Sequence, residues 1–186
     1  MIACSVLGDV VIALAQRTPA PGGGAAAAIA AALGCAAGAM AARYTTGVKY
    51  ADRSPQAEAL AETLDRTACT CLRLAEADSE AYAALIAARK NRDEPAIAAA
   101  ATAAATVPAT LLETCATQAQ ALATFLPLSN PHLRSDVKVG IHLLAGGGRA
   151  AWQTLLVNVL DPTTEQTARA RLAQLDAAER AALETV

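Results

Sequence analysis

Aromatic side chains are scarce in this sequence: they make up 3% of its 186 residues, with one Trp, one Phe and three Tyr. Charged residues are also few, at 17%, whereas 54% of the chain is hydrophobic. A core built on large aromatic rings is therefore excluded. Roughly a quarter of the chain is Ala, the residue that loses least on entering a helix. The composition predicts one all-α domain over residues 1–186, a bundle of five or six helices packed through small side chains.

An excess of positive charge is also missing. The chain has 15 basic and 17 acidic residues, a formal net charge of -2 and a pI of about 5.7. Proteins that bind nucleic acid present a basic surface to the phosphate backbone, and this balance does not provide one. We therefore expect no nucleic acid among the partners of this protein.

Neither a disulfide framework nor a metal-binding motif is present. The five Cys are an odd number scattered through apolar runs, which is typical of small buried side chains in a reducing cytosol. Cys69 and Cys71 are two residues apart and so point to opposite sides of a helix. His132 and His142 are too far apart for a common ligand motif. We expect no metal, and because the N-terminus lacks a basic secretory leader we expect a cytoplasmic location.

One long segment near the N-terminus, residues 22–42, lacks charge altogether. It has about the length of a membrane span, but its bulk is Ala, which gains little from entering lipid. Gly34 and Gly38 lie one helical turn apart, so a second helix can approach closely, from this chain or from another subunit. We predict a buried helix of a soluble protein, with no membrane partner.

Apolar spacing and stop signals divide the chain into helices. Pro19 and Pro21 end the first helix, Gly47 ends the second, and Pro162 follows the fifth. Pro108 is expected to kink or break the fourth. The predicted helices cover about residues 5–16, 24–46, 54–90, 93–126, 135–159 and 163–185.

The second helix is preceded by a loop that ends in Pro21, Gly22, Gly23 and Gly24. Unpaired amides at a helix N-terminus favour an anion or a polar ligand edge, and glycines let a ligand come close to the backbone. The loop lacks both the Lys of a P-loop and the glycine spacing of a dinucleotide site. It is therefore either a small-molecule site of another kind or only a flexible helix start.

Several polar residues stand where apolar or neutral ones would suffice. Asp78 lies within the apolar stripe of the third helix, where a carboxylate needs a structural partner or a ligand. Lys49 and Tyr50 follow the second helix, and Lys49 is either a solvated loop residue or part of a site.

Two further polar positions are on the fifth helix. Ser135 and Asp136 open it, where capping and the helix dipole account for both residues without a ligand. Asn158 lies beside the apolar stripe near the end of that helix, so its side-chain amide should find a hydrogen-bond partner.

The order of these features resembles the cyclodeaminase/cyclohydrolase family of folate enzymes. That family includes the deaminase half of formiminotransferase-cyclodeaminase and stand-alone methenyltetrahydrofolate cyclohydrolases. The matching segments are PAPGGGAAAAIAAALGCAAGAMAARYTTGVKY, LAEADSEAYAALIAARK and SDVKVGIHLLAGGGRAAWQTLLVNV. The first is the most specific, because Pro-Gly-Gly-Gly, an Ala-rich helix and a Gly-x-Lys-Tyr exit occur at the family's spacing.

The resemblance implies an all-helical homodimer, paired through Ala- and Gly-rich helices, that uses no metal cofactor and binds a tetrahydrofolate derivative as its substrate. It implies a catalytic role for Lys49 and Asp136. The residues implied in substrate binding are Pro21, Gly22, Gly23, Gly24, Tyr50, Asp78, Ser135 and Asn158. The chain departs from the family pattern at Thr154, where an Asn is frequent, and at His142 and Trp152.

The implied chemistry suits these side chains. In 5,10-methenyltetrahydrofolate a cationic carbon bridges two nitrogens, and opening the bridge needs a base for the water and an acid for the departing nitrogen. Asp136 can serve as both, and Lys49 can position it or donate a proton. The expected reaction is hydrolysis to 10-formyltetrahydrofolate. Cyclodeamination of 5-formiminotetrahydrofolate, with release of ammonia, is the nearest alternative, and a noncatalytic helical dimer that acts as a binding module is the alternative of another class.

Overall fold

The computed structural model describes residues 6–158 and 160–184, and all regular elements in these ranges are helical. This confirms the predicted all-α fold. The helices are α1 (Leu7–Leu14), α2 (Gly23–Arg43), α3 (Ser54–Asn91), α4 (Glu94–Phe125), α5 (Arg134–Leu155) and α6 (Pro162–Glu184). Short 3-10 turns form η2 (Val48–Tyr50), η3 (Leu126–Leu128) and η4 (Pro131–Leu133).

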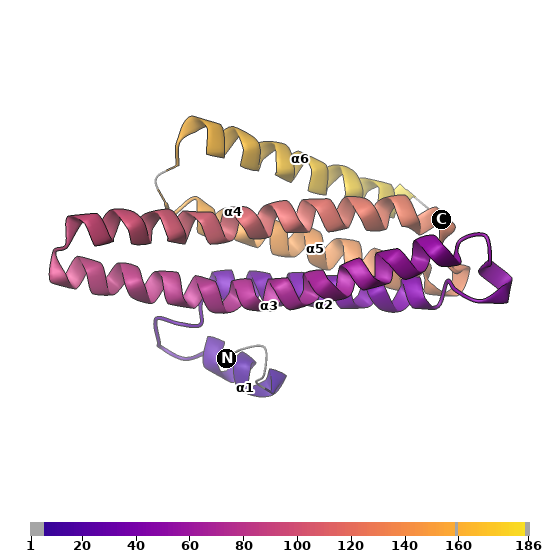
Figure 1. Cartoon of the computed structure of the whole chain (residues 1–186), viewed down its shortest axis with the longest axis horizontal. Coiled ribbons are helices and arrows are strands. Elements are labelled where there is room, and N and C mark those ends of the chain that lie inside the picture. The colour runs from indigo at the N-terminus through magenta and orange to yellow at the C-terminus, as the bar shows by residue number, and fades with distance from the viewer. Residues whose placement is uncertain (1–5, 159, 185–186) are drawn as a thin grey trace.

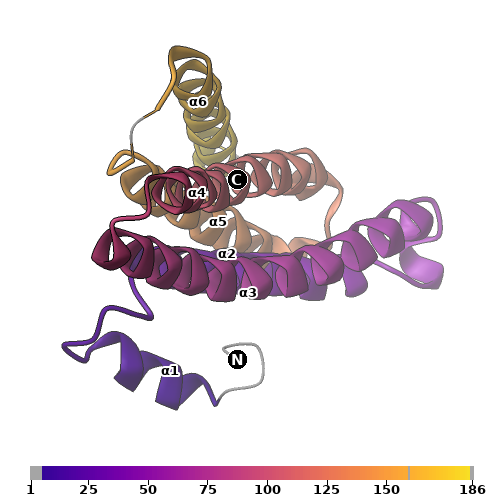
Figure 2. The same cartoon turned by 60° about the vertical axis from the view of Figure 1, so that its left-hand side comes forward.

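The four long helices α2, α3, α4 and α5 form an antiparallel bundle (Figure 1). In cross-section α2 contacts α3 and α5, and α4 contacts α5 and α3, so α2 and α4 are diagonal. Helix α6 packs on the outside of α4 and α5. Helix α1 lies apart from the bundle in both views (Figures 1 and 2). Short connections force successive long helices to alternate in direction.

This alternation gives the bundle two functional ends. The start of α2 and the end of α5 lie at one end, called here the glycine end, where α3 and α4 extend well beyond α2 (Figure 1). The end of α2 and the start of α5 lie at the other, called here the lysine end because η2 follows there. The amide N–H of Asn130 donates to Thr45 Oγ1 at 3.0 Å, which joins the two segments at the lysine end.

Helix α2 packs against α5 backbone to backbone. A Cβ added to Gly34 would lie 2.9 Å from the carbonyl oxygen of Gly140, and one added to Gly147 would lie 2.9 Å from that of Ala27. No side chain fits at such separations. The helix that approaches Gly34 is therefore α5 of the same chain, so these glycines are not available to another subunit.

Gly147→Ala is expected to destabilise the protein, and Gly146→Ala to stabilise it. The added methyl group of the first variant meets the backbone of α2, which cannot yield without moving a helix, so we expect a loss of about 1–3 kcal/mol. The methyl group added in Gly146→Ala meets nothing within 4 Å. Replacing a helical Gly with Ala raises the free energy of unfolding by about 0.5–1 kcal/mol. Thermal unfolding measures both, and equal melting temperatures would contradict the close approach.

Of the kink or break expected at Pro108, the break does not occur, because α4 continues from Glu94 to Phe125. Proline has no N–H, so the carbonyl of Ala104 loses its helical donor. The side-chain amide of Asn158 donates to that carbonyl at 3.4 Å, a long bond that nevertheless gives the oxygen a partner. Pro108 is also buried against the neighbouring helices. Tertiary packing thus offsets a local defect that the sequence alone shows as a break.

The helix ends agree with the predicted bounds to within a few residues. Helix α2 ends at Arg43, a turn earlier than predicted, and α5 ends at Leu155. Ser135 is not the cap of α5, because the helix begins one residue before it and the cap position is Leu133. Residues 5, 159 and 185, at three predicted ends, lie outside the described residues.

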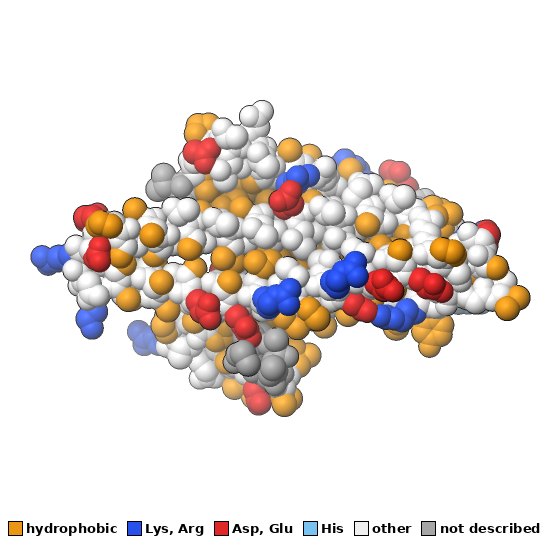
Figure 3. Space-filling model, viewed as in Figure 1, with side chains coloured by type: hydrophobic (Ala, Val, Ile, Leu, Met, Phe, Trp, Pro, Cys, Tyr) orange, Lys and Arg blue, Asp and Glu red, His pale blue; other side chains and the backbone are white. Residues whose placement is uncertain are grey.

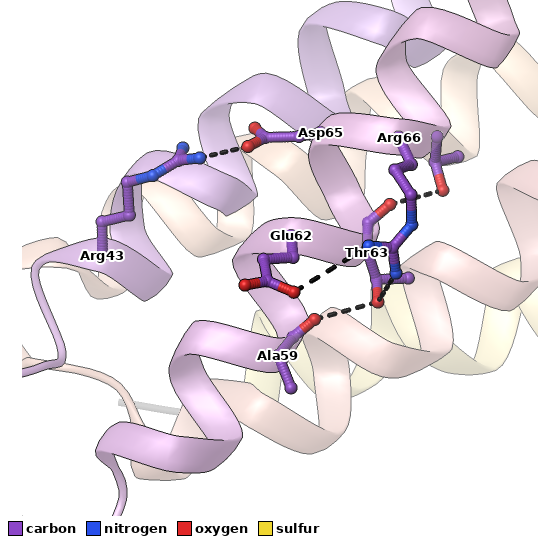
Figure 4. A network of polar contacts seen from close by, with 7 residues as sticks. Arg43, Ala59, Glu62, Thr63, Asp65 and Arg66 are labelled. Carbon is purple, nitrogen blue, oxygen red and sulfur yellow. Dashed lines mark hydrogen bonds and ion pairs between the residues drawn. The ribbon is translucent and has the colours of Figure 1, made fainter.

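The end of α2 is tied to α3 by an ion pair between Arg43 and Asp65 (Figure 4). On α3 itself, the guanidinium of Arg66 donates to Thr63 Oγ1 at 3.2 Å and lies 3.9 Å from Glu62. Exposed pairs of this kind contribute little to stability.

Two of the departures from the family pattern serve the contact between α5 and α6. His142 Nδ1 lies 2.8 Å from the carboxylate of Glu179. Arg149 also donates to Glu179, and this hydrogen bond lowers the pKa of that carboxyl. The guanidinium of Arg169 lies over the side chain of Trp152, with its Cζ atom 5.5 Å from the centre of the Trp152 ring. His142 and Trp152 therefore hold the outer helix in place.

Two segments, Gly23–Arg43 and Glu94–Leu128, are long and apolar enough to cross a membrane by length and composition. In the first, 61% of the apolar window is buried inside the bundle, as in the core helix of a soluble protein, and in the second 22% is buried. On the face in Figure 3, charged side chains of both signs gather over α3, and α4 shows few.

The cysteines are mostly core residues. Cys35, Cys71 and Cys115 are buried, as predicted, but Cys69 is exposed. A hydrogen bond with Cys71 raises the pKa of the Cys35 thiol, and burial raises the pKa of the Cys115 thiol. These two thiols are therefore kept neutral and act as small apolar side chains.

Candidate functional site

A cavity of about 480 Å³ opens at the glycine end, where α3 and α4 extend beyond the start of α2. It is lined by Gly22, Gly23 and Gly24 where the loop enters α2, by Asp78 from α3 and by Asn158 after α5. Small-molecule sites typically have volumes of about 300–1,000 Å³. Five of the predicted site residues, from three separate segments, thus share one cavity of suitable size, called here the glycine cavity.

The carboxylate of Asp78 lies directly against the start of α2. A Cβ added to Gly24 would fall on this carboxylate, so only glycine admits it. Burial raises the pKa of Asp78, and a hydrogen bond from the backbone N–H of Ala25 partly offsets this rise. Asp78 is thus a half-buried carboxylate whose ionised form gains from a further donor, which a ligand can supply.

The side-chain amide group of Asn158 donates hydrogen bonds within the chain, which leaves its amide oxygen as an acceptor. The Nδ2 group donates to the carbonyl of Thr154 at 3.1 Å and to that of Ala104 at 3.4 Å. The predicted partner for this amide is therefore present. Asn158 lines the glycine cavity, and with both of its amide hydrogens engaged, its amide oxygen remains as an acceptor.

Sequence reasoning missed several residues that line the same cavity. Pro21 does not line it, whereas Pro19 and Ala20 do. Tyr82 and Arg89 line it from α3, at helical spacing from Asp78. The signal was present, because Asp78, Tyr82 and Arg89 share one helix face. The sequence predicts an apolar stripe along the Asp78 face, yet Tyr82 is 45% exposed.

The predicted Lys-Tyr pair lies at the lysine end, in η2. Lys49 is exposed and makes no ion pair with the described residues; its Nζ lies 5.3 Å from the centre of the Tyr50 ring. Tyr50 is buried, and its hydroxyl has no hydrogen-bond partner in the described part of the chain. A buried phenol without a partner is uncommon and requires an explanation.

Ser135 and Asp136 lie at the same end, in the first turn of α5. Ser135 Oγ donates to Asp136 Oδ2 at 3.4 Å, a weak contact. Asp136 is partly buried and has no ion-pair partner among the described residues. Its position in the first turn favours a negative charge. Lys49 and Asp136 are thus an unpaired cation and an unpaired anion at one end of the bundle.

The predicted site residues therefore form two groups rather than one. Asp136, at the lysine end, and Thr154, which lines the glycine cavity, are both on α5. They are 18 residues apart, which on a helix is about 27 Å. In one chain the two groups are therefore too far apart to contact the same ring of a small molecule. No group of three or more His, Cys, Asp or Glu able to hold a metal ion is found in the described residues.

The fold and the glycine cavity define a small-molecule-binding protein of the helical-bundle class. The chain belongs to the formiminotransferase-cyclodeaminase family, whose model matches residues 6–177. This is a family of folate one-carbon enzymes that act on tetrahydrofolate derivatives, as the sequence resemblance indicates.

A solved structure agrees with this assignment. The crystal structure of formiminotetrahydrofolate cyclodeaminase from Thermotoga maritima is similar, with a TM-score of 0.90 and 25% sequence identity. The match covers 98% of this chain and 96% of that one. No curated protein sequence matches this chain significantly.

Proposed function

We propose that this protein is a cytoplasmic enzyme that acts on the one-carbon unit carried by N5 of tetrahydrofolate. The observation that supports this most is the glycine cavity, where the glycine loop, Asp78 and Asn158 converge. The pterin ring presents a row of N–H donors, and the Asp78 carboxylate, which accepts one hydrogen bond from the backbone N–H of Ala25, has further lone pairs to accept them. Glycines at its side let the flat ring approach the backbone.

The first reaction we propose is cyclodeamination of 5-formiminotetrahydrofolate. The similar chain from Thermotoga maritima bears that name, and the match covers 98% of this chain and 96% of that one. N10 of the folate attacks the formimino carbon and loses its proton, and the former imino nitrogen leaves as ammonia after gaining protons. A carboxylate such as Asp136 can accept the first proton, and an ammonium such as Lys49 can donate one.

Hydrolysis of 5,10-methenyltetrahydrofolate is the second candidate, because it needs the same groups. Water takes the place of N10 as the nucleophile, and a folate nitrogen is the leaving group. The unpaired carboxylate of Asp136 also stabilises the cationic bridge in either reaction. The same two side chains can therefore assist attack on the one-carbon unit by either nucleophile, N10 or water.

A second copy of the chain would bring the two groups of residues together. Asp136, Leu143, Ala150 and Thr154 are spaced by seven, seven and four residues, so they lie along one face of α5. This face leads from the lysine end to the glycine cavity. In a two-fold symmetric dimer with antiparallel α5 helices, Asp136 of one copy lies beside Thr154 of the other.

The surface beside this face has the character of a subunit interface. Between Gly23 and Ala42, helix α2 has no charged residue. Leu33 and Met40 are 47% and 38% exposed on its outer side, and Val139 on α5 is 49% exposed. Such a run of apolar side chains marks an interaction surface. We propose that Lys49 and Asp136 of one copy complete the glycine cavity of its partner.

The decisive experiment offers each substrate to the purified protein. Ammonia release with appearance of methenyl absorbance from 5-formiminotetrahydrofolate supports the first candidate. Loss of that absorbance when 5,10-methenyltetrahydrofolate is added supports the second. Folate binding without either reaction would identify a binding module, and no binding at all would refute the proposed function.

Gly24→Ala is expected to weaken folate binding by at least about tenfold, because the added methyl group displaces the Asp78 carboxylate that holds the pterin. Gly8→Ala on α1 is the matched control. Its methyl group would meet nothing within 4 Å, and Gly8 does not line the glycine cavity, so affinity should stay close to that of the wild type. Fluorescence titration with tetrahydrofolate measures both. Equal affinities for the two variants would show that Asp78 does not hold the ligand.

A further inference from the structure

One aromatic side chain lines the glycine cavity among the described residues: Tyr82, which comes from α3 and is 45% exposed. Aromatic residues are scarce in this chain, so their positions are informative. The others lie elsewhere: Tyr44 and Tyr50 at the lysine end, Phe125 in the core, and Trp152 beneath Arg169. Tyr82 is therefore the ring that this chain presents to a ligand in the cavity.

Contacts within the chain do not explain why a tyrosine stands at this position. An aromatic side chain stabilises a fold mainly by burying its ring, and nearly half of the Tyr82 side chain is exposed. Its hydroxyl makes no hydrogen bond with the described part of the chain. The face of the ring is thus available to another flat group.

The position of Tyr82 relative to Asp78 suits a bound ring. The two residues are four apart on α3, so Tyr82 lies on the same face, about 6 Å further along the helix axis. In the proposed function, Asp78 accepts hydrogen bonds from the N–H edge of the pterin. An acceptor at the edge leaves the faces of that ring uncovered. The glycines that line the cavity have no side chains to compete for these faces.

We propose that the ring of Tyr82 stacks on the flat pyrimidine ring of the pterin and so selects a planar heterocycle in the glycine cavity. Offset stacked rings attract each other through dispersion and through their complementary charge distributions. Asp78 then recognises the donor pattern at the edge of the ligand, and Tyr82 recognises its shape. The inference rests on the proposed function, since it adds a second contact to the same pterin.

The test measures the affinity of two ligands for the full-length protein by calorimetric titration. The ligands are tetrahydrofolate and 6-methyltetrahydropterin, which has the pterin but neither the aminobenzoyl nor the glutamate group. Tyr82→Leu removes the ring and is expected to weaken both ligands by roughly tenfold. Tyr82→Phe keeps the ring and is expected to bind both within about twofold of the wild type. Thermal unfolding checks that both variants are folded.

Ile86→Ala is the matched control for Tyr82→Leu. Ile86 follows Tyr82 by one helical turn and is also 45% exposed, but it does not line the glycine cavity. Its replacement should leave the affinity of both ligands unchanged. An equal loss in Ile86→Ala would show a general effect of changing this part of α3 and would overturn the assignment to Tyr82.

The remaining outcomes separate this inference from the proposed function. If Tyr82→Leu binds as the wild type does, if Tyr82→Phe loses as much as Tyr82→Leu, or if the loss is confined to tetrahydrofolate, the stacking is overturned while folate binding stands. Binding of tetrahydrofolate without binding of 6-methyltetrahydropterin would also overturn it, because the pterin would not be the part recognised. If the wild type does not bind tetrahydrofolate, the proposed function itself fails.

Discussion

Lys49→Met and Asp136→Asn are each expected to lower the turnover number by roughly 10²-fold or more, with substrate saturating. Both side chains are unpaired within the described chain, so their charges are available to the reacting atoms. Each substitution keeps the approximate size of the side chain and removes its charge. Because Lys49 is exposed and Asp136 only partly buried, both variants should fold normally. Steady-state assays with either substrate measure the effect.

The double variant tests whether the two residues act together. If they handle one proton transfer as a unit, the loss in the double variant is smaller than the product of the two single losses. Asp52→Asn is the matched control for Asp136→Asn, because Asp52 is an exposed carboxylate paired with Arg53 at 3.3 Å, and loss of its charge should change the rate little. An unchanged turnover number in either charge variant would remove that residue from the mechanism. An increase in KM alone would assign it to binding.

A mixture of two impaired variants is expected to regain activity if the site is shared between two copies. Lys49→Met damages the lysine end, and Gly24→Ala damages the glycine cavity. In a mixed dimer one site combines both defects and the other combines two intact halves. When the variants are coexpressed at equal levels, half of the dimers are mixed, so about a quarter of wild-type activity should return.

The control for this experiment is a mixture of Lys49→Met with Asp136→Asn. Both changes lie at the lysine end, so both sites of the mixed dimer remain damaged and no activity should return. Activity is measured below the KM of the wild type, where the weak binding of Gly24→Ala is visible. If the first mixture stays inactive, or if the control mixture recovers equally, each site is built within one chain.

Local patterns predicted most of the helices because their end signals act over a few residues. Pro and Gly between the helices limit where a helix can continue, and the apolar spacing identified each one. Pro108 shows where local rules fail. Its helix continues because Asn158, which is 50 residues later, gives the Ala104 carbonyl a donor and because neighbouring helices cover the proline. No local pattern contains that information.

The candidate site, like the fold, could be predicted from the sequence only in part. The glycine loop, Asp78 and Asn158 could be identified from the sequence, because a carboxylate in an apolar stripe and three successive glycines are costly without a use. Arg89 was not identified, since an exposed Arg near a helix end is ordinary until a cavity is known to reach it.

The sequence by itself determined the helical class, the Ala- and Gly-rich packing and the membership of a folate enzyme family. These follow from helix propensity, spacing and motif order, which are properties of neighbouring residues. Only the tertiary structure decided that Gly34 packs against α5 of its own chain, and that Lys49 and Asp136 lie at the opposite end of the bundle from Asp78. The reason is that the direction and length of packed helices fix which distant residues meet, and spacing along the chain does not.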